Sequence, residues 1–269
     1  MKITVVTISY NAKVEIERTI HSVVNQRLAD FEYIVVDGAS TDGTVDIIRK
    51  YQNIITKWIS EPDTGIYNAM NKGIDMATGD YCIFMNAGDV FANNNVLYQI
   101  DSFLKLGYDI YNGNAFYVKN REVLWYRKCH KDVSLSYFYR SSICHQATFI
   151  KTDLLKSLHY DEGFRMVSDW KFWIQTLCKG GASYLPVDVD VCCFDMTGLT
   201  NTNRERGLKE RNVVLQELLT EEERNHCEVI ICKNRKRFYR NKYLSIQRNL
   251  WLLYARIFKK RQILKATRS

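Results

Sequence analysis

The sequence predicts an α/β protein in which a mixed, Rossmann-like sheet is flanked by helices. Apolar, β-branched runs of strand length alternate with amphipathic segments over the first 90 residues. Turn-forming and polar residues follow those runs. The composition is 46% hydrophobic and 25% charged, with 2 prolines in 269 residues. Such a chain is neither disordered nor collagen-like, and it is long enough to bury a core.

The first half follows a strand–helix alternation. The first ten residues are apolar on both faces, as in a buried parallel strand. Further strands are predicted at 31–36, 54–60 and 81–85. Helices are predicted at 14–26, 45–51 and 66–77, from apolar residues at helical spacing. Right-handed crossovers would join these strands into a sheet whose carboxyl ends form a ligand crevice.

The pattern is looser in the second half, which predicts a mixed arrangement. Strands are expected near 109–118, 121–127 and 183–191, and helices near 95–106, 152–158, 167–178 and 205–219. We therefore expect one domain over 1–219, made of two halves, 1–90 and 91–219. Residues 220–269 are expected to form a helical extension.

The positive charge is concentrated at the C-terminus. Residues 233–269 contain 13 Lys and Arg and no Asp or Glu, which leaves 25 bases against 30 acids upstream. Large apolar and aromatic residues are interleaved with these bases, which is typical of an interfacial helix on anionic lipid. RNA is the competing partner for such a tail, and a solvated basic helix is the third interpretation.

Several classes are excluded by absent features. The longest run without a charge is 11 residues, 90–100, too short to cross a bilayer. Eight cysteines occur without Cys-x-x-Cys spacing or a signal peptide, which predicts reduced thiols and a cytoplasmic protein. The sequence contains neither a dinucleotide-binding glycine motif, nor a P-loop, nor a nucleophile elbow.

The remaining candidates for functional residues are carboxylates at the ends of predicted strands. Asp37 follows the second predicted strand and is either a ligand for a ribose or base, or a turn residue, although Asp42 suits the turn better. Asp89 follows the strand 81–85 and is either a metal ligand or a helix N-cap. Such a site suits a divalent cation and, through it, a diphosphate.

Four ordered motifs together resemble family-2 glycosyltransferases of the GT-A fold. They are Val5-Val6-Thr7-Ile8-Ser9-Tyr10-Asn11, the stretch from Ile34 to Thr44 (IVVDGASTDGT), the stretch from Glu61 to Ile74 (EPDTGIYNAMNKGI), and Asn86-Ala87-Gly88-Asp89. The similarity covers about residues 1–195.

The resemblance implies that residues 1–90 form a nucleotide-sugar half and residues 91–219 an acceptor half, and it implies roles for residues in the first of these. Thr7, Ser9, Tyr10 and Asp37 would hold the nucleoside, and Asp63 and Lys72 would face the nucleotide sugar. Lys72 is otherwise a solvated helix lysine. Asn86 and Gly88 stand where the family usually has aspartates, so Asp89 is the carboxylate left for the metal. This implies weak binding of a divalent cation, Mn²⁺ or Mg²⁺.

The resemblance also implies a catalytic base in the second half. The family places it in an acidic pair that opens a helix, and Asp169 matches that position, with Ser168 replacing the first acid. His145, Gln146 and Trp170 are acceptor-side candidates. Trp125, Trp170 and Trp173 could stack on sugar rings, although core packing is the default for each tryptophan and for His145.

The predicted function is inverting transfer of a sugar from a nucleotide diphosphate donor, UDP-linked, to a hydroxyl of a lipid-linked or cell-envelope glycan. The absence of a C-terminal Arg-Trp motif favours single additions. The protein is expected in the cytoplasm, at the inner face of the membrane, with nucleic acid not expected as a partner. The alternatives are an RNA-binding protein and a sugar-phosphate nucleotidyltransferase, although the glycine-rich first loop of the latter is absent.

Overall fold

A computed structural model describes residues 1–28, 30–198 and 203–233. The chain divides into two compact units, Met1–Leu218 and Leu219–Ser269. In the second unit, residues 221–233 are helical, and the rest of the predicted basic tail lies outside the described residues. None of the helices in the described part combines the length and hydrophobicity needed to span a bilayer.

A nine-stranded mixed sheet crosses the described part of the first unit, which confirms the predicted α/β class. The strand order is β3-β2-β1-β4-β8-β6-β9-β5, with β7 paired to β6. Strands β1 to β4 are parallel, whereas β8 runs antiparallel to both β4 and β6. The strands are β1 (Ile3–Ser9), β2 (Phe31–Asp37), β3 (Lys57–Ser60), β4 (Tyr81–Phe84), β5 (Val90–Phe91), β6 (Ile110–Lys119), β7 (Glu122–Arg127), β8 (Thr148–Lys151) and β9 (Tyr184–Asp195).

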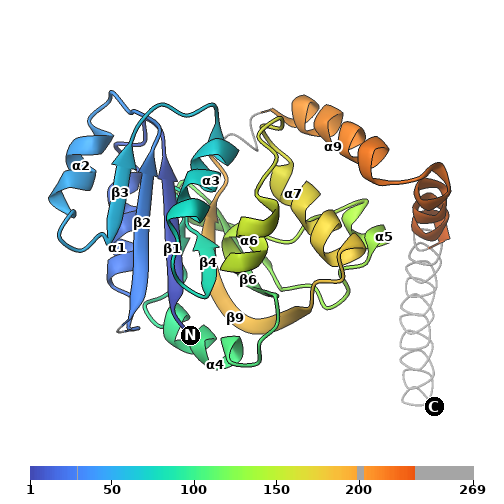
Figure 1. Cartoon of the computed structure of the whole chain (residues 1–269), viewed down its shortest axis with the longest axis horizontal. Helices are drawn as coiled ribbons and strands as arrows, with labels where there is room; N and C mark the ends of the chain where they lie inside the picture. Colours follow the sequence, from blue (N-terminus) through green and yellow to red (C-terminus); the bar gives the residue numbers. More distant parts are fainter. Residues whose placement is uncertain (29, 199–202, 234–269) are drawn as a thin grey trace, which may run out of the picture. The chain divides into compact units, whose positions relative to one another are not determined.

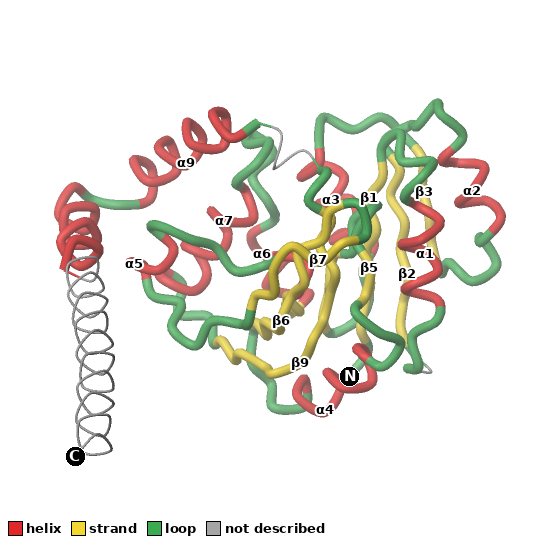
Figure 2. The backbone as a smooth tube through the Cα atoms, turned by 180° about the vertical axis from the view of Figure 1, so that it is seen from behind, coloured by secondary structure: helices red, strands yellow, loops and turns green. Residues whose placement is uncertain are grey.

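Helices cover both faces of this sheet. Helices α3 and α6 lie on one face, which is toward the viewer in Figure 1, and α1 lies on the other, which Figure 2 shows. The buried side chains of α1 are at helical spacing, as predicted. The helices are α1 (Ile16–Val24), α2 (Thr44–Lys50), α3 (Ile66–Met76), α4 (Val96–Leu104), α5 (Leu135–Phe138), η1 (His145–Ala147), α6 (Thr152–Leu158), α7 (Ser168–Trp173), the π-helical η2 (Ile174–Lys179) and α9 (Arg204–Leu218).

The elements that sequence patterns missed are short. β5, α5, η1 and β8 have two to four residues each, too few to show a period of 2 or 3.6. The predicted strand at 54–60 begins only at Lys57, because the N–H groups of Ile54 and Ile55 bond back to Tyr51 in the turn after α2. The predicted helix 167–178 widens into the π-helical turn after Trp173.

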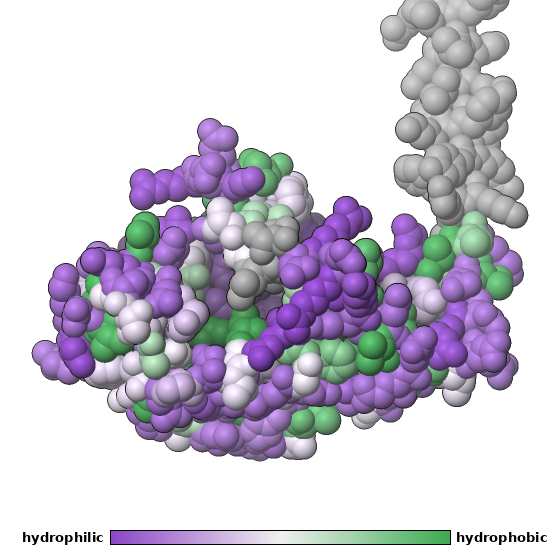
Figure 3. Space-filling model, turned by 90° about the horizontal axis from the view of Figure 1, so that it is seen from above, coloured by the Kyte–Doolittle hydropathy of each residue, from purple (hydrophilic) through white to green (hydrophobic). Residues whose placement is uncertain are grey.

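The parallel register brings three polar residues into one row at the carboxyl edge of the sheet. Ser9 at the end of β1 pairs with Asp37 of β2, which pairs with Ser60 of β3. This edge is uppermost in Figure 1. Seen from above in Figure 3, the surface is hollowed, with apolar side chains inside the hollow.

Candidate active site

The Asp37 carboxylate holds three segments of the donor-side edge together. It is buried and accepts hydrogen bonds from the hydroxyls of Ser9 (3.0 Å), Ser60 (2.8 Å) and Ser40 (2.6 Å), and from the Ser40 N–H (2.8 Å). These bonds fix the loop after β2. Tyr10, the next residue after β1, is 67% exposed at the same edge.

Two other polar residues of this half have structural partners. Thr7 is buried inside the sheet, where its hydroxyl donates to the Met85 carbonyl (2.8 Å) and lies 3.1 Å from the Tyr33 hydroxyl. Thr7 therefore lies within the sheet, whereas Ser9 is at the strand end, bonded to Asp37, and Tyr10 is exposed. Asp42 accepts from the N–H groups of Lys13 and Thr44 at 3.0 Å each, as expected of a turn aspartate.

Asp63 approaches the Asp37 loop closely because residue 38 is glycine. A Cβ at Gly38 would lie 2.3 Å from one Asp63 carboxylate oxygen, while the other oxygen accepts from the Gly65 N–H (2.8 Å). Lys72 is engaged by the Glu61 carboxylate and the Pro62 carbonyl, both at 2.8 Å. Asp63 and Lys72 thus frame the segment that leads into α3.

Arg165 lies against the start of α3. Gly65 has a φ of +139°, and a Cβ there would lie 1.7 Å from the Arg165 guanidinium, so only glycine fits. Within the described residues, this guanidinium has no hydrogen-bond acceptor or ion-pair partner. Arg165 is therefore an exposed guanidinium at the start of α3 without an ion-pair partner among the described residues, and no sequence pattern singled it out.

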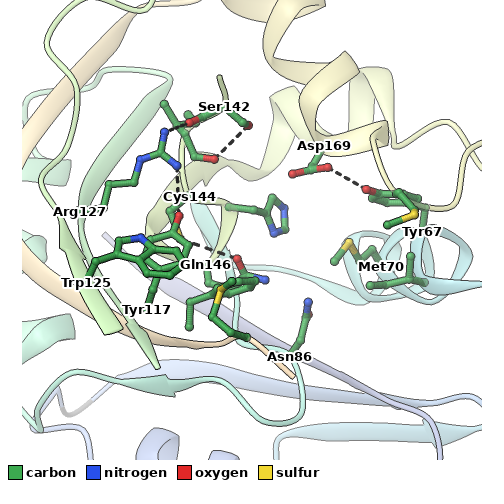
Figure 4. A pocket seen from close by; sticks show the side chains of 16 residues that line it. Tyr67, Met70, Asn86, Tyr117, Trp125, Arg127, Ser142, Cys144, Gln146 and Asp169 are labelled. Atoms are coloured by element: carbon green, nitrogen blue, oxygen red, sulfur yellow. Dashed lines mark hydrogen bonds between the residues drawn. The ribbon is translucent and has the colours of Figure 1, made fainter. Parts of the chain in front are cut away.

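A pocket of about 300 Å³ lies next to this cation, between the two halves of the sheet (Figure 4). It combines an apolar and aromatic lining with a few polar groups. Its lining residues are Ile66, Tyr67, Met70, Asn86, Tyr117, Trp125, Arg127, Ser142, Ile143, Cys144, His145, Gln146, Met166, Asp169, Phe194 and Met196.

Asp169 opens α7 and faces this pocket. Its carboxylate accepts a hydrogen bond from the Tyr67 hydroxyl (2.8 Å), drawn in Figure 4. Burial, together with the negative charge of Asp169, raises the pKa of Tyr67 well above its usual value, so Tyr67 remains a donor. Tyr67 belongs to the motif 61–74, and its place in that motif is the sequence feature that could have marked it as a site residue.

His145 and Gln146 line the same pocket. His145 is buried, and its Nε2 lies 2.8 Å from the Tyr160 hydroxyl. Burial lowers the pKa of His145, although the nearby Asp169 opposes this effect. The imidazole is therefore neutral at neutral pH, which suits packing and hydrogen bonding rather than charge.

Trp170 lies elsewhere. Its indole is buried and donates to the carbonyls of Phe138 (2.9 Å) and Ser141 (3.0 Å), and the Arg211 guanidinium lies 4.5 Å from the centre of its ring. Trp170 therefore packs α7 against α5 and α9 instead of lining the pocket. Trp125 of β7 lines it.

The turn from Asn86 to Asp89 connects the pocket to β9. Asp89 is buried, and its carboxylate accepts from the Asp195 N–H (2.8 Å). Burial raises the pKa of Asp89 well above its usual range. Arg18 donates to the Gly88 carbonyl and to the Asp195 carboxylate (3.1 Å), so the turn is tied to α1 and to the end of β9.

Two oxygen donors of this turn fit a divalent cation. Asn86 Oδ1 is buried at the pocket without a hydrogen-bond partner, and Asp89 contributes a carboxylate with one N–H donor. No group of three His, Cys, Asp or Glu residues in the described part of the chain is arranged as a metal site. Mg²⁺ in phosphate sites commonly takes only one or two protein oxygens. The residues therefore fit a cation held mainly by a diphosphate and water.

This fold and this site define a class of enzyme: the chain is a glycosyltransferase with the GT-A fold. It belongs to glycosyl transferase family 2, whose family model matches residues 4–169. The family match confirms the predicted class of enzyme, a glycosyltransferase. It does not support the alternative class, a sugar-phosphate nucleotidyltransferase.

Three similar proteins come from bacteria. The PGL/p-HBAD biosynthesis glycosyltransferase of Mycobacterium bovis is 30% identical over 188 residues, which are 67% of this chain and 72% of that protein. The putative teichuronic acid biosynthesis glycosyltransferase TuaG of Bacillus subtilis is 36% identical over 106 residues, 38% of this chain and 42% of that protein. The crystal structure of S. aureus TarS 1-349 in complex with UDP-GlcNAc matches with a TM-score of 0.61 and 23% identity, covering 72% of this chain and 58% of that one.

Proposed function

We propose that this protein transfers a single sugar, with inversion, from a UDP-linked donor to a hydroxyl of a lipid-linked or cell-envelope glycan. The observation that carries the proposal is the Asp169 carboxylate, which lines a pocket whose other side is formed by the Asn86 turn. The relatives named for PGL and teichuronic acid biosynthesis support an envelope glycan, and the UDP-GlcNAc complex of TarS supports a UDP donor.

The donor would lie along the carboxyl edge of the sheet. Ser9, Tyr10 and the loop held by Asp37 would contact the nucleoside. Arg165 would face the diphosphate, since its guanidinium lies against Gly65 at the start of α3 and has no ion-pair partner among the described residues. Thr7 would act indirectly, by fixing β1 against β2 and β4.

Asn86 and Asp89 would hold the divalent cation when the donor binds. A bound cation would neutralise charge on the diphosphate as it leaves. Arg165 would act on the same charge from the side of α3. Because the turn supplies few carboxylates, we expect UDP binding to require millimolar rather than trace metal.

Asp169 would act as general base. It would accept the proton of the acceptor hydroxyl while the oxygen bonds to the anomeric carbon and the bond from that carbon to the diphosphate breaks. Tyr67, which remains protonated, would orient the carboxylate through its hydrogen bond. UDP and the inverted glycoside would be the products.

Calorimetric titration of UDP with and without Mn²⁺, followed by NMR of the product anomer, tests this function. Binding of UDP and an inverted anomer are the expected results. Retention of configuration, or preference for another nucleotide, would contradict the proposal. Asp89→Asn should abolish the Mn²⁺ dependence of UDP affinity, and Asp42→Asn, which alters a turn carboxylate, should not.

A further inference from the structure

The edge strand β7 exposes an unusual run of large apolar side chains. Val123, Leu124, Trp125 and Tyr126 are between 46% and 59% exposed, in consecutive positions. β7 pairs with β6 alone among the described strands. A contiguous exposed apolar run on an edge strand invites aggregation, so it calls for an explanation by binding.

One residue of this run belongs to the pocket. Side chains alternate between the faces of a strand, and of the four only Trp125 lines the pocket. Its ring stacks on Tyr117 of β6, with centroids 4.8 Å apart and planes 17° apart. Tyr117 in turn packs edge-on against Phe194 at 5.3 Å, and its hydroxyl accepts from Arg127 (3.2 Å).

The Trp125 ring is therefore held in place before any ligand binds. Tyr117 covers part of it, yet 46% of the residue remains exposed. A fixed aromatic ring offers a flat apolar surface at low entropic cost, because little side-chain freedom is lost on binding.

The opposite wall of the pocket carries polar groups beside Met70. Figure 4 shows Trp125 and Tyr117 on one side and Asp169 on the other, with Asn86 and Gln146 between them. Asn86 Oδ1 is assigned to the cation, whereas the Asp169 carboxylate accepts one hydrogen bond, from Tyr67 (2.8 Å), and has capacity for another from a ligand hydroxyl. A sugar ring matches both walls, since it has an apolar C–H face and a hydroxyl edge. An alkyl chain would offer the Asp169 carboxylate no donor.

We propose that Trp125 is the acceptor platform of this enzyme: a pyranose ring of the acceptor glycan stacks on its indole, and a hydroxyl of that ring points toward Asp169. This inference rests on the proposed function and names its acceptor as a sugar rather than a lipid chain or a phenol. Trp125 would act as a positioning residue for the acceptor.

Saturation-transfer difference NMR on the full chain tests the platform, with UDP and a panel of methyl hexopyranosides as probes. Wild type should transfer saturation to the ring C–H protons of at least one glycoside. Trp125→Ala should lower the affinity for that glycoside about tenfold, which corresponds to about 1.4 kcal/mol of binding free energy. Trp125→Phe should retain part of the affinity. Leu124→Ala is the matched control, because Leu124 is equally exposed on the same strand and does not line the pocket.

The two proposals fail differently in this experiment. UDP signals report the donor site and should be equal in all four proteins. Glycoside signals that are absent from wild type, or unchanged in Trp125→Ala, would overturn the platform whatever UDP does. Signals from p-cresol or octanol in place of the glycosides would assign the surface to a phenol or an alkyl chain. Absence of the UDP signals alone, with the glycoside signals as expected, would contradict the proposal of a UDP donor but not the proposal that Trp125 binds the acceptor sugar.

Discussion

Asp169 and Asp153 occupy the same position in two helices, and only Asp169 faces the pocket. Each is the second residue of its helix, after Ser168 in α7 and Thr152 in α6. Asp169→Asn should lower sugar transfer at least about 100-fold, because the amide cannot accept the acceptor proton. UDP affinity should be unchanged. Turnover with a saturating donor and calorimetry of UDP measure the two effects.

Asp153→Asn is the control for this substitution. Asp153 is exposed and does not line the pocket, so its variant should keep wild-type turnover. Near-normal transfer by Asp169→Asn would remove Asp169 from the mechanism. A joint loss of turnover and UDP affinity would indicate misfolding instead.

The lowered pKa of Glu32 predicts that the free energy of unfolding depends on pH. Burial alone would raise the pKa of Glu32, but hydrogen bonds from the Thr78 N–H, Thr4, Lys57 and the Thr78 hydroxyl lower the pKa from its ordinary value of 4.5 to about 2. The folded state thus favours the carboxylate, and the resulting stability is present above pH 4.5 and lost as the pH falls toward 2. Glu32→Gln should cost about 2 to 3 kcal/mol at pH 7.

Urea unfolding at a series of pH values measures this effect. The difference between wild type and Glu32→Gln should shrink as the pH falls below 4.5. Glu205→Gln, an exposed change on α9, should shift stability by less than about 0.5 kcal/mol. A difference that stays constant with pH would show that the loss is not electrostatic.

At the scale of elements, α9 fixes the segment that leads into α7. Its residue Glu210, 12% exposed, accepts from the backbone N–H groups of Arg165 (3.1 Å) and Met166 (2.9 Å). Glu210→Ala should cost about 1 to 3 kcal/mol by leaving these donors unpaired. It should also lower turnover about tenfold or more, because Arg165 and Asp169 flank that segment.

Glu205→Ala on the same helix is the comparison. Glu205 is 80% exposed and, among the described residues, forms an ion pair only with Lys209, four residues on (2.7 Å), so its loss should be nearly neutral. Thermal unfolding and transfer rates of both variants decide the matter. Equal turnover in the two would mean that α9 does not position the catalytic segment.

At the scale of the whole molecule, the basic tail is predicted to hold the enzyme on anionic membranes, near a lipid-linked acceptor. Each base near such a surface contributes about 1 kcal/mol at low salt, and apolar side chains add attraction that salt does not screen. A chain ending at Cys232 should no longer bind liposomes that contain anionic lipid, but it should still bind UDP. Flotation of both chains in rising salt is the measurement.

The RNA interpretation of the tail gives a different result in the same assay. Equal flotation of both chains, or retention of the full chain by RNA but not by anionic liposomes, would reject the membrane anchor. Flotation that weakens with salt without vanishing would support it.

Sequence by itself determined the class of fold and the family, because both depend on local patterns. Continuous apolar runs define β1, β2 and β4, and the motifs around Asp37, Asp63 and Asp89 follow strand ends. The predicted helix start at Asp169 is also confirmed, while its role as catalytic base stays a prediction. These features need only neighbouring residues and strand-end geometry.

Only the tertiary structure decided which side chains share the pocket. Trp125 and Trp170 are both tryptophans in apolar segments. Trp125, on β7, lines the pocket, whereas Trp170 is buried against α5 and α9. Thr7 and Ser9 share one motif, but only Ser9 is at the strand end. Arg165 gains its place from Gly65, a hundred residues away. Such proximity depends on packing between distant segments, which no local period encodes.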